Sequence, residues 1–329
     1  MTTYKGINGF AVQSVATDPS PLDEGQVWYN NATYAFKLAS LSTVGTWAAG
    51  GNMNTARRQL TGFGTQTAAV GFGGGPPAAG TTENYNGTSW TSSGSLNTSR
   101  RLSGGAGTQT AGLGFAGYLD PGVSAATEKY NGTSWTSVSS MGTAKYNLGG
   151  CGTQTAALGF GGYISAPNVY SITTEAYNGT SWTATGNLNT GKNALAGAGI
   201  QTAALAFGGF SAGAVLSAVT ESFNGSTWTS VNSMNTARRS LSGAGASSTS
   251  ALAFGGYNSP TAVTGATELW NGTSWTTNPN SMSTARSFLG GAGTQTAGLA
   301  IGGFTTTPVA STEEFTGPGS PVTQTITTS

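Results

Sequence analysis

Short apolar runs alternate with turn-forming clusters of Gly, Asn, Ser and Thr along most of the chain. In one representative unit, a run of small residues at 241–245 leads through a polar turn at 247–249 to an apolar run at 251–257. Two further β-prone runs follow at 267–270 and 274–276. Runs of this length predict four short antiparallel strands rather than helices.

The last two strands of this unit are joined by Asn271-Gly272. Asn-Gly between β runs is a strong hairpin signal, because both residues tolerate the positive φ of a type I′ turn. The stretch Tyr130–Trp135 carries the same motif, and its tryptophan recurs at intervals of about 46 residues, a period typical of solenoids, propellers and arrays. The recurring tryptophans are Trp47, Trp90, Trp135, Trp182, Trp228 and Trp275.

Four short strands in each period predict a propeller blade. Five units carry all four strands, whereas the sixth ends after Thr312–Phe315 with no tryptophan behind it. Residues 45–48 supply a matching last strand near the N-terminus. We therefore expect an all-β fold, a six-bladed β-propeller closed by that N-terminal strand, since closure removes an exposed sheet edge.

The repeat predicts three parts of the chain. Residues 1–40 form an attachment segment in which 25–30 and 33–37 read as a β-hairpin. Residues 41–317 form the propeller, and 318–329 form a flexible or partner-bound tail. Because an isolated hairpin is marginal in water, it should lean on the propeller, another subunit or a partner particle.

Three kinds of side chain repeat with the strands. Each tryptophan should wedge between neighbouring blades and supply large apolar contacts. A cation before the first strand and a glutamate in the third strand should be neighbours, because the connections that carry them lie on one face of a meander. We favour a structural ring of ion pairs over a charged rim that recognises a ligand. The cations are Arg57, Arg100, Lys145, Lys192, Arg238 and Arg286, and the glutamates are Glu83, Glu128, Glu175, Glu221, Glu268 and Glu313.

Composition narrows the possible functions. Only 7% of residues are charged and the net charge is +1, so no global field attracts nucleic acid. No apolar run is long enough for membrane insertion, and the N-terminus lacks a signal peptide. The chain has no histidine, and we expect no metal and no cofactor. The single cysteine, Cys151, is expected to fill a small-residue slot.

Catalysis is not expected. A carboxylate pair for glycoside hydrolysis could come only from the repeated glutamates, and their repetition favours architecture. Recognition is expected instead in the loops between the second and third strands, which differ in every unit. We predict binding residues there, although packing of flanking strands explains Tyr163 and Tyr257 equally well. The candidates are Tyr118, Asp120, Tyr163, Tyr170, Phe210 and Tyr257.

The series Met-x-x-x-Arg, small strand, Phe-Gly-Gly-Tyr, Glu-x-Tyr, turn and Trp resembles the Kelch repeat over most of the chain. This resemblance implies a β-propeller that serves as an interaction scaffold, without naming a partner. The turn before the tryptophan is shorter than is common in Kelch repeats. The absence of histidine excludes the copper chemistry of Kelch-type galactose oxidases.

The Gly/Thr/Ser/Asn-rich, His-free composition, and the pairing of the hairpin that begins with Gly25–Asn30 with turns such as Tyr130–Trp135, resemble tail-fibre and related virion proteins of bacteriophages. This resemblance implies a non-enzymatic virion protein, assembled in the host cytoplasm. Its residues 1–40 would contact other virion proteins, and its propeller would bind a host-surface glycan or protein. Homo-oligomerisation stays open. The alternatives are a cellular Kelch-type scaffold and, third, a glycan-degrading propeller enzyme.

Overall fold

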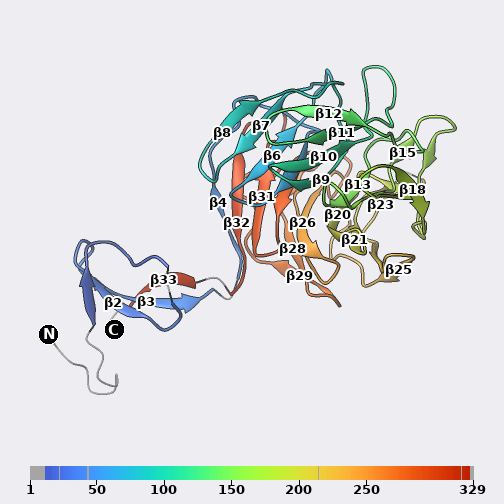
Figure 1. Ribbon diagram of the computed structural model, residues 1–329. Coiled ribbons are helices and arrows are strands. Elements are labelled where there is room, and N and C mark those ends of the chain that lie inside the picture. The colour runs from blue at the N-terminus through green and yellow to red at the C-terminus, as the bar shows by residue number, and fades with distance from the viewer. Residues whose placement is uncertain (1–11, 22, 43, 214, 320, 327–329) are drawn as a thin grey trace. The chain divides into compact units, whose positions relative to one another are not determined.

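The computed structural model describes residues 12–326 except positions 22, 43, 214 and 320. Every regular element in these residues is a β-strand, which confirms the all-β prediction (Figure 1). The chain divides into two compact units: residues 46–315 form the larger, and residues 1–45 together with 316–329 form the smaller. In the described residues, no helix is long and apolar enough to cross a membrane.

The larger unit contains, among its described residues, six four-stranded antiparallel sheets, which we number I to VI. Sheets I to III are β5 (Thr61–Gly64), β6 (Ala69–Phe72), β7 (Thr82–Tyr85) and β8 (Trp90–Ser93); β9 (Gly104–Thr108), β10 (Ala111–Phe115), β11 (Thr127–Tyr130) and β12 (Trp135–Val138); and β13 (Gly149–Gly152), β14 (Ala157–Phe160), β17 (Thr174–Tyr177) and β18 (Trp182–Thr185). Sheets IV to VI are β20 (Ala196–Ile200), β21 (Ala203–Phe207), β24 (Thr220–Phe223) and β25 (Trp228–Val231); β26 (Ser242–Ser247), β27 (Ser250–Phe254), β28 (Thr267–Trp270) and β29 (Trp275–Asn278); and β30 (Gly290–Gly293), β31 (Ala297–Ile301), β32 (Thr312–Thr316) and β4 (Thr46–Ala49).

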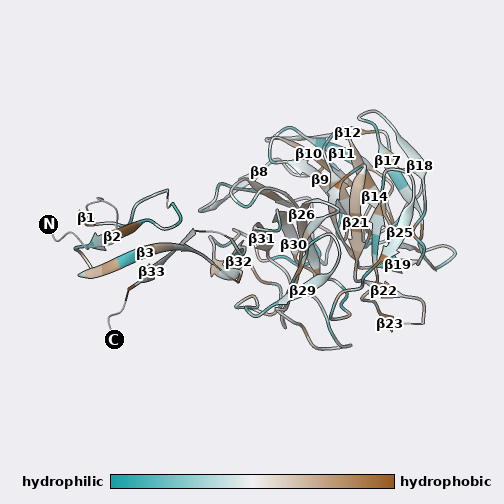
Figure 2. Cartoon of the chain, turned by 90° about the horizontal axis from the view of Figure 1, so that it is seen from below, coloured by the Kyte–Doolittle hydropathy of each residue, from teal (hydrophilic) through white to brown (hydrophobic). Residues whose placement is uncertain are grey.

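The sheets are arranged like the blades of a propeller. The first strand of each sheet contacts the first strand of the next, from β5 through β9, β13, β20 and β26 to β30, and β30 also contacts β5. The second strands are hydrophobic (Figure 2): β14 is buried along its whole length, and β21 is buried except at its first residue. In the fourth strands β8, β12 and β25 the first residue, a tryptophan, is buried and the next two residues are exposed. The architecture is therefore propeller-like, with the core between the sheets.

Small residues fill the first strands because their backbones lie close together. A Cβ atom on Gly62 would lie 2.8 Å from the carbonyl oxygen of Gly291, and one on Gly150 would lie 3.0 Å from that of Gly105. The second strand ends earlier than the sequence predicts: β27 ends at Phe254, because Gly255 and Gly256 turn the chain with φ of +67° and +102°.

The Asn-Gly turns differ from the predicted type I′ geometry. In sheet V the amide of Asn271 donates to the carbonyl of Ser274 at 3.2 Å, and of the Asn-Gly pair only Gly272 has a positive φ, +93°. Asn271 therefore occupies the first position of the turn rather than a central one. Its side-chain Oδ1, in place of its own backbone carbonyl, accepts the Ser274 amide at 2.8 Å. The predicted hairpin is present, and its turn chemistry is that of an Asx turn.

The smaller unit contains a four-stranded sheet in the order β1 (Gln13–Val15), β2 (Val27–Asn30), β3 (Ala35–Leu41) and β33 (Pro321–Thr325). β2 and β3 form the predicted hairpin around residues 31–34, and β1 lies parallel to β2. The expected flexible or partner-bound tail differs, because β33 pairs antiparallel with β3 and extends the sheet. Positions 1–11, 22, 320 and 327–329 of the predicted attachment segment and tail lie outside the described residues.

Two partly buried hydrogen bonds to Asp18 anchor this small sheet. Trp28 is fully buried, and its indole N–H donates to Asp18 Oδ1 at 2.9 Å. Asn30 Nδ2 donates to the same oxygen at 2.7 Å. These two hydrogen bonds, from Asn30 and Trp28, lower the pKa of Asp18, because they stabilise its ionised form.

Candidate functional site

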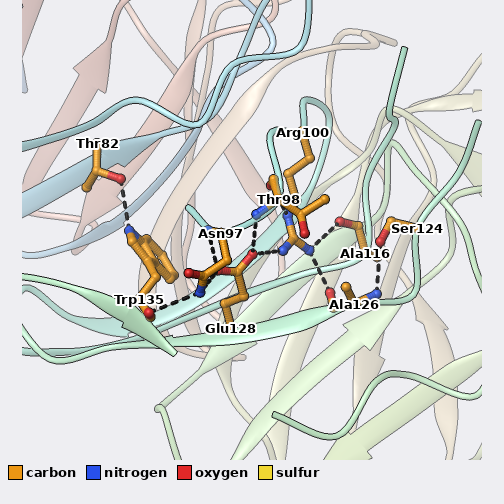
Figure 3. A network of polar contacts seen from close by, with 9 residues as sticks. All are labelled: Thr82, Asn97, Thr98, Arg100, Ala116, Ser124, Ala126, Glu128 and Trp135. Carbon is orange, nitrogen blue, oxygen red and sulfur yellow. Dashed lines mark hydrogen bonds and ion pairs between the residues drawn. The ribbon is translucent and has the colours of Figure 1, made fainter. Parts of the chain in front are cut away.

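The repeated tryptophans join neighbouring sheets. The indole N–H of Trp135 donates to Thr82 Oγ1 of the preceding sheet at 2.9 Å (Figure 3), and its ring centroid lies 4.9 Å from that of Phe72. Every copy makes the same bond to a threonine in the third strand of the preceding sheet. The pairs are Trp47–Thr267, Trp90–Thr312, Trp135–Thr82, Trp182–Thr127, Trp228–Thr174 and Trp275–Thr220.

The repeated cations and glutamates meet inside the blades. Arg100 is fully buried, forms an ion pair with Glu128, and donates to the carbonyl of Ala126 at 2.7 Å (Figure 3). The other oxygen of Glu128 accepts the amide of Asn97 at 2.8 Å. Asn97 belongs to the connection between sheets I and II, so the glutamate clamps that connection onto its own blade.

All six predicted pairs form, and all are buried: Arg57–Glu83, Arg100–Glu128, Lys145–Glu175, Lys192–Glu221, Arg238–Glu268 and Arg286–Glu313. Burial lowers the pKa of each of these six cations. Since the pairs are removed from solvent, they do not form a charged rim for a ligand.

A ring of backbone hydrogen bonds, which we call the mouth ring, surrounds a cavity at one end of the first strands. Its six residues each stand two positions after a repeated cation, and each has a positive φ between 50° and 60°. The amide of each donates to the carbonyl of its counterpart in the preceding blade, at 2.7 to 2.9 Å. The cycle begins and ends at Gln59, whose amide donates to Phe288. The members of this mouth ring are Gln59, Leu102, Asn147, Ala194, Ser240 and Phe288.

An aromatic belt lies beside the mouth ring. Ring centroids of successive tyrosines are 5.1 Å apart for Tyr118–Tyr146, 5.7 Å for Tyr146–Tyr163 and 5.3 Å for Tyr163–Tyr170. Tyr170 lies 6.3 Å from Phe210. Burial, with the neighbouring tyrosines, raises the pKa of Tyr146, so its hydroxyl stays a hydrogen-bond donor at neutral pH.

The belt continues through a cation. The guanidinium carbon of Arg239 lies 4.9 Å from the centroid of Phe210 and 5.1 Å from that of Tyr257. Tyr257 in turn lies 5.9 Å from Phe288. A second arginine, Arg101, lies 4.8 Å over Tyr118 at the other end. The aromatic belt therefore comprises Tyr118, Tyr146, Tyr163, Tyr170, Phe210, Arg239, Tyr257 and Phe288.

Two cavities occupy this face. A cavity of about 130 Å³ inside the mouth ring is lined largely by small residues of the first strands and by the leucines just before them. A second cavity of about 290 Å³ lies between the belt and the mouth ring. It is lined by Tyr146, Asn147, Tyr163, Tyr170, Asn193, Ala194, Phe210, Arg239, Ser240 and Phe288. We call this second cavity the belt pocket and take it as the candidate site, because aromatic faces and polar groups converge in it.

The structure brings five of the six predicted binding residues into one belt. Tyr163, Tyr170 and Phe210 line the belt pocket, while Tyr118 and Tyr257 flank it. Asp120 lies apart from the pocket. Its carboxylate pairs with Arg101 at 2.9 Å and accepts the amide of Ala78 at 2.5 Å, and the bond from Arg101 is the main reason that its pKa is lowered.

Sequence reasoning missed the other side of the pocket. Tyr146, Asn193 and Arg239 each follow a repeated cation directly, and each pairs with a predicted loop residue: Tyr163, Phe210 and Tyr257. In the sequence, the position directly after each cation varies from unit to unit, whereas the cation itself repeats. This contrast was the available signal for the three residues.

The arrangement favours recognition. Aromatic faces provide stacking surfaces, and the asparagine, serine and arginine side chains provide hydrogen-bonding groups. Within the described residues, no cluster of three or more His, Cys, Asp or Glu side chains could hold a metal ion. Comparison with family models finds no match, and a search of curated proteins finds no matching sequence.

Proposed function

We propose that this chain is a non-enzymatic binding protein of a virion, in which the propeller recognises a host-surface glycan or protein through the belt pocket. The observation that carries the binding function is the convergence of aromatic and polar side chains on a cavity of about 290 Å³. The repeated tryptophans join each sheet to the preceding one, and the ion pairs form within single repeats, so neither of these recurring contacts uses the side chains of the pocket.

We further propose that sheets I to VI are the six blades of one Kelch-like propeller, closed by the N-terminal strand β4. Three observations support closure. β4 pairs with β32 in sheet VI. The mouth ring returns from Gln59 to Phe288. Gln66 Nε2 donates to the carbonyls of Gly298 and Phe315 at 3.0 and 2.8 Å, which joins sheet I to sheet VI.

The environment of the glutamates favours binding over glycoside hydrolysis. A glycosidase needs two carboxyl groups on either side of a bound sugar. Each repeated glutamate of the larger unit is instead buried against its own cation. The belt pocket itself is lined by no Asp or Glu. These carboxylates therefore serve the fold, and the pocket presents aromatic, hydrogen-bonding and cationic groups.

The first experiment tests binding. The full-length chain is applied to an array of bacterial surface polysaccharides and animal glycans, beside the double variant Tyr163→Ala/Tyr170→Ala. The matched control is Ile200→Ala, an exposed apolar residue that is 45% exposed at the opposite end of its blade. We expect some glycans to bind both the native chain and the control, and the double variant to have lost binding to those glycans. Equal binding by all three chains would place recognition elsewhere.

The second experiment tests the virion. Antibody against the full-length chain is used for immunogold electron microscopy of particles purified from a lysate that contains the chain. Gold on the particles supports the assignment. Antigen confined to the cell fraction would favour the cellular scaffold. Scoring the array for released products separates binding from a glycan-degrading enzyme, since only an enzyme shortens the bound glycans.

A further inference from the structure

We infer that the belt pocket takes an acidic sugar, and that the guanidinium of Arg239 anchors the sugar's carboxylate. The inference deepens the proposed binding function and rests on it. Arg239 is half-buried and lines the pocket, and its guanidinium carbon lies 4.9 Å from the ring centroid of Phe210 and 5.1 Å from that of Tyr257. Cation–π contacts with two rings restrain the guanidinium, and its planar N–H groups suit a ligand carboxylate.

Arg239 has no carboxylate partner among the described residues. Its Nε is buried without a hydrogen-bond partner, as are those of Arg58 and Arg101 on the same face. The eight acidic residues of the larger unit are all engaged elsewhere: seven are in ion pairs with other cations, and Glu314 accepts the hydroxyl of Tyr85 at 2.6 Å. The guanidinium of Arg239 therefore has no anionic partner among the described residues, and a ligand carboxylate would supply one.

The charge around the mouth points the same way. Arg58, Arg101 and Arg239 all lie on this face, each over an aromatic ring, and Asp120 is the acidic residue that pairs among them. The face is therefore cationic although the whole chain has a net charge of only +1. A concave surface with one sign of charge concentrates ligands of the opposite sign.

The remaining lining identifies the ligand as a sugar. Tyr146, Tyr163 and Tyr170 present aromatic faces and hydroxyls, which suit the apolar faces and hydroxyl groups of a pyranose ring. Asn147 and Asn193 add amide donors and acceptors that suit ring hydroxyls. A carboxylate matches the fork of a guanidinium with two parallel hydrogen bonds. Uronic and sialic acids combine these two features.

The test uses uronic-acid and sialic-acid oligosaccharides, each beside its carboxyl-reduced counterpart and a sulfated neutral glycan. Full-length protein should bind acidic members and lose the reduced ones. In Arg239→Met, affinity for the bound acidic glycans should fall by about 10- to 100-fold, the usual worth of a charge-assisted bond. Arg58→Met is the matched control, because Arg58 also stacks on a ring, Phe304, yet does not line the belt pocket.

Each outcome decides the assignment. Equal binding of acidic and reduced glycans overturns the carboxylate anchor and leaves the proposed binding function standing. Binding of sulfated glycans alone overturns the carboxylate in favour of a sulfate. Binding of no glycan removes both the inference and the glycan form of the proposed function. If Arg239→Met melts earlier than the native chain, Arg239→Lys, which keeps the charge but not the fork, gives the readout. Unchanged affinity in a folded Arg239→Lys would then overturn the bidentate contact.

Discussion

Lys145→Arg should stabilise the protein. Four of the six buried pairs use arginine, and in Arg57 and Arg238 the guanidinium reaches the glutamate at 2.9 Å. Lys145 lies 3.9 Å from Glu175, and the Glu175 Oε1 is buried without a hydrogen-bond partner. Filling a buried acceptor is worth about 1 to 3 kcal/mol of unfolding free energy.

The polar contacts around Lys145 also suit an arginine. Lys145 Nζ donates to the carbonyl and hydroxyl of Thr173 at 3.1 and 3.0 Å. In sheet VI a serine stands at the position of Thr173, and Arg286 Nη1 donates to that Ser311 hydroxyl at 2.9 Å. A guanidinium in place of the Lys145 amine can therefore keep the hydroxyl contact and also reach the carboxylate. Lys192 is a poorer choice for substitution, because Val219 provides no hydroxyl there.

The pH dependence of the stability gained by Lys145→Arg provides a second test of this prediction. Burial lowers the pKa of Lys145 from 10.5 to about 8. At 1.36 kcal/mol per pKa unit, this shift means that the folded state pays about 3 kcal/mol at neutral pH for holding the ammonium. Between pH 8 and 10.5 the unfolded chain binds this proton and the folded chain releases it, so native stability rises with pH. Arginine does not titrate there, and the advantage of Lys145→Arg should shrink across that window.

Urea unfolding followed by tryptophan fluorescence at pH 7 and pH 10 measures both effects. At pH 7 we expect a gain of about 1 to 3 kcal/mol, or an increase of a few degrees in Tm. Lys129→Arg is the control, because the Lys129 amine lies near the surface over Tyr177 and should change stability by less than about 0.5 kcal/mol. A loss of stability at pH 7, or a gain that is the same at both pH values, would refute the reasoning.

Four further outcomes follow from the same contacts. Trp182→Ala should lower the unfolding free energy by about 3 to 5 kcal/mol, since it removes the Phe115 contact and the Thr127 bond; an unchanged thermal melt would contradict the wedge. Glu221→Gln should cost about 3 to 5 kcal/mol by urea unfolding, because it leaves the fully buried Lys192 unpaired; a change below about 0.5 kcal/mol would mean that the pair is solvated. Cys151 should resist alkylation by iodoacetamide until the chain unfolds, because burial raises its pKa to about 12, and labelling of the native protein would argue against burial. Gln109→Ala should cost about 1 to 3 kcal/mol, since it frees the carbonyls of Ala69 and Tyr85; the matched substitution Ser248→Ala, in the sheet that lacks this glutamine, should be near neutral.

Repetition made much of the fold predictable. A feature that recurs in every unit, such as the tryptophan or the buried ion pair, appears six times in the sequence, and its spacing reveals its place in the blade. The predictions that were wrong in detail concern single contacts that the repeat spacing does not reveal. The sequence Asn271-Gly272 does not say whether asparagine occupies a central position or caps the turn, because its side chain can replace its own carbonyl. The pairing of β33 with β3 joins segments that share no repeat, so no spacing predicted it.

The candidate site was harder to predict because its residues do not repeat. Loop length directed attention to Tyr163, Tyr170 and Phe210, yet the opposite wall of the pocket comes from residues that follow the cations. In the sequence, Arg239 looks like a duplicate of the repeated cation Arg238, with the same structural role. In the structure, Arg238 is fully buried against Glu268, while Arg239 lines the belt pocket. Successive side chains of an extended backbone point to opposite sides, so the buried arginine and the arginine that lines the pocket are neighbours in the sequence.

The mouth ring gives a physical reason to regard this face as functional. The chain has 53 glycines and places many of them at positive φ, yet none of the six ring positions is glycine. A side chain in the left-handed region costs about 1 kcal/mol or more, which glycine would avoid. The bond from each tryptophan to a threonine of the preceding sheet recurs without these side chains, so joining the sheets would be served by one small residue at all six positions. The ring instead carries six different side chains, Gln59, Leu102, Asn147, Ala194, Ser240 and Phe288. Four of these six residues line the belt pocket beside Arg239. Backbone strain that makes room for a different side chain in each unit is expected where the ring contacts a ligand without sixfold symmetry.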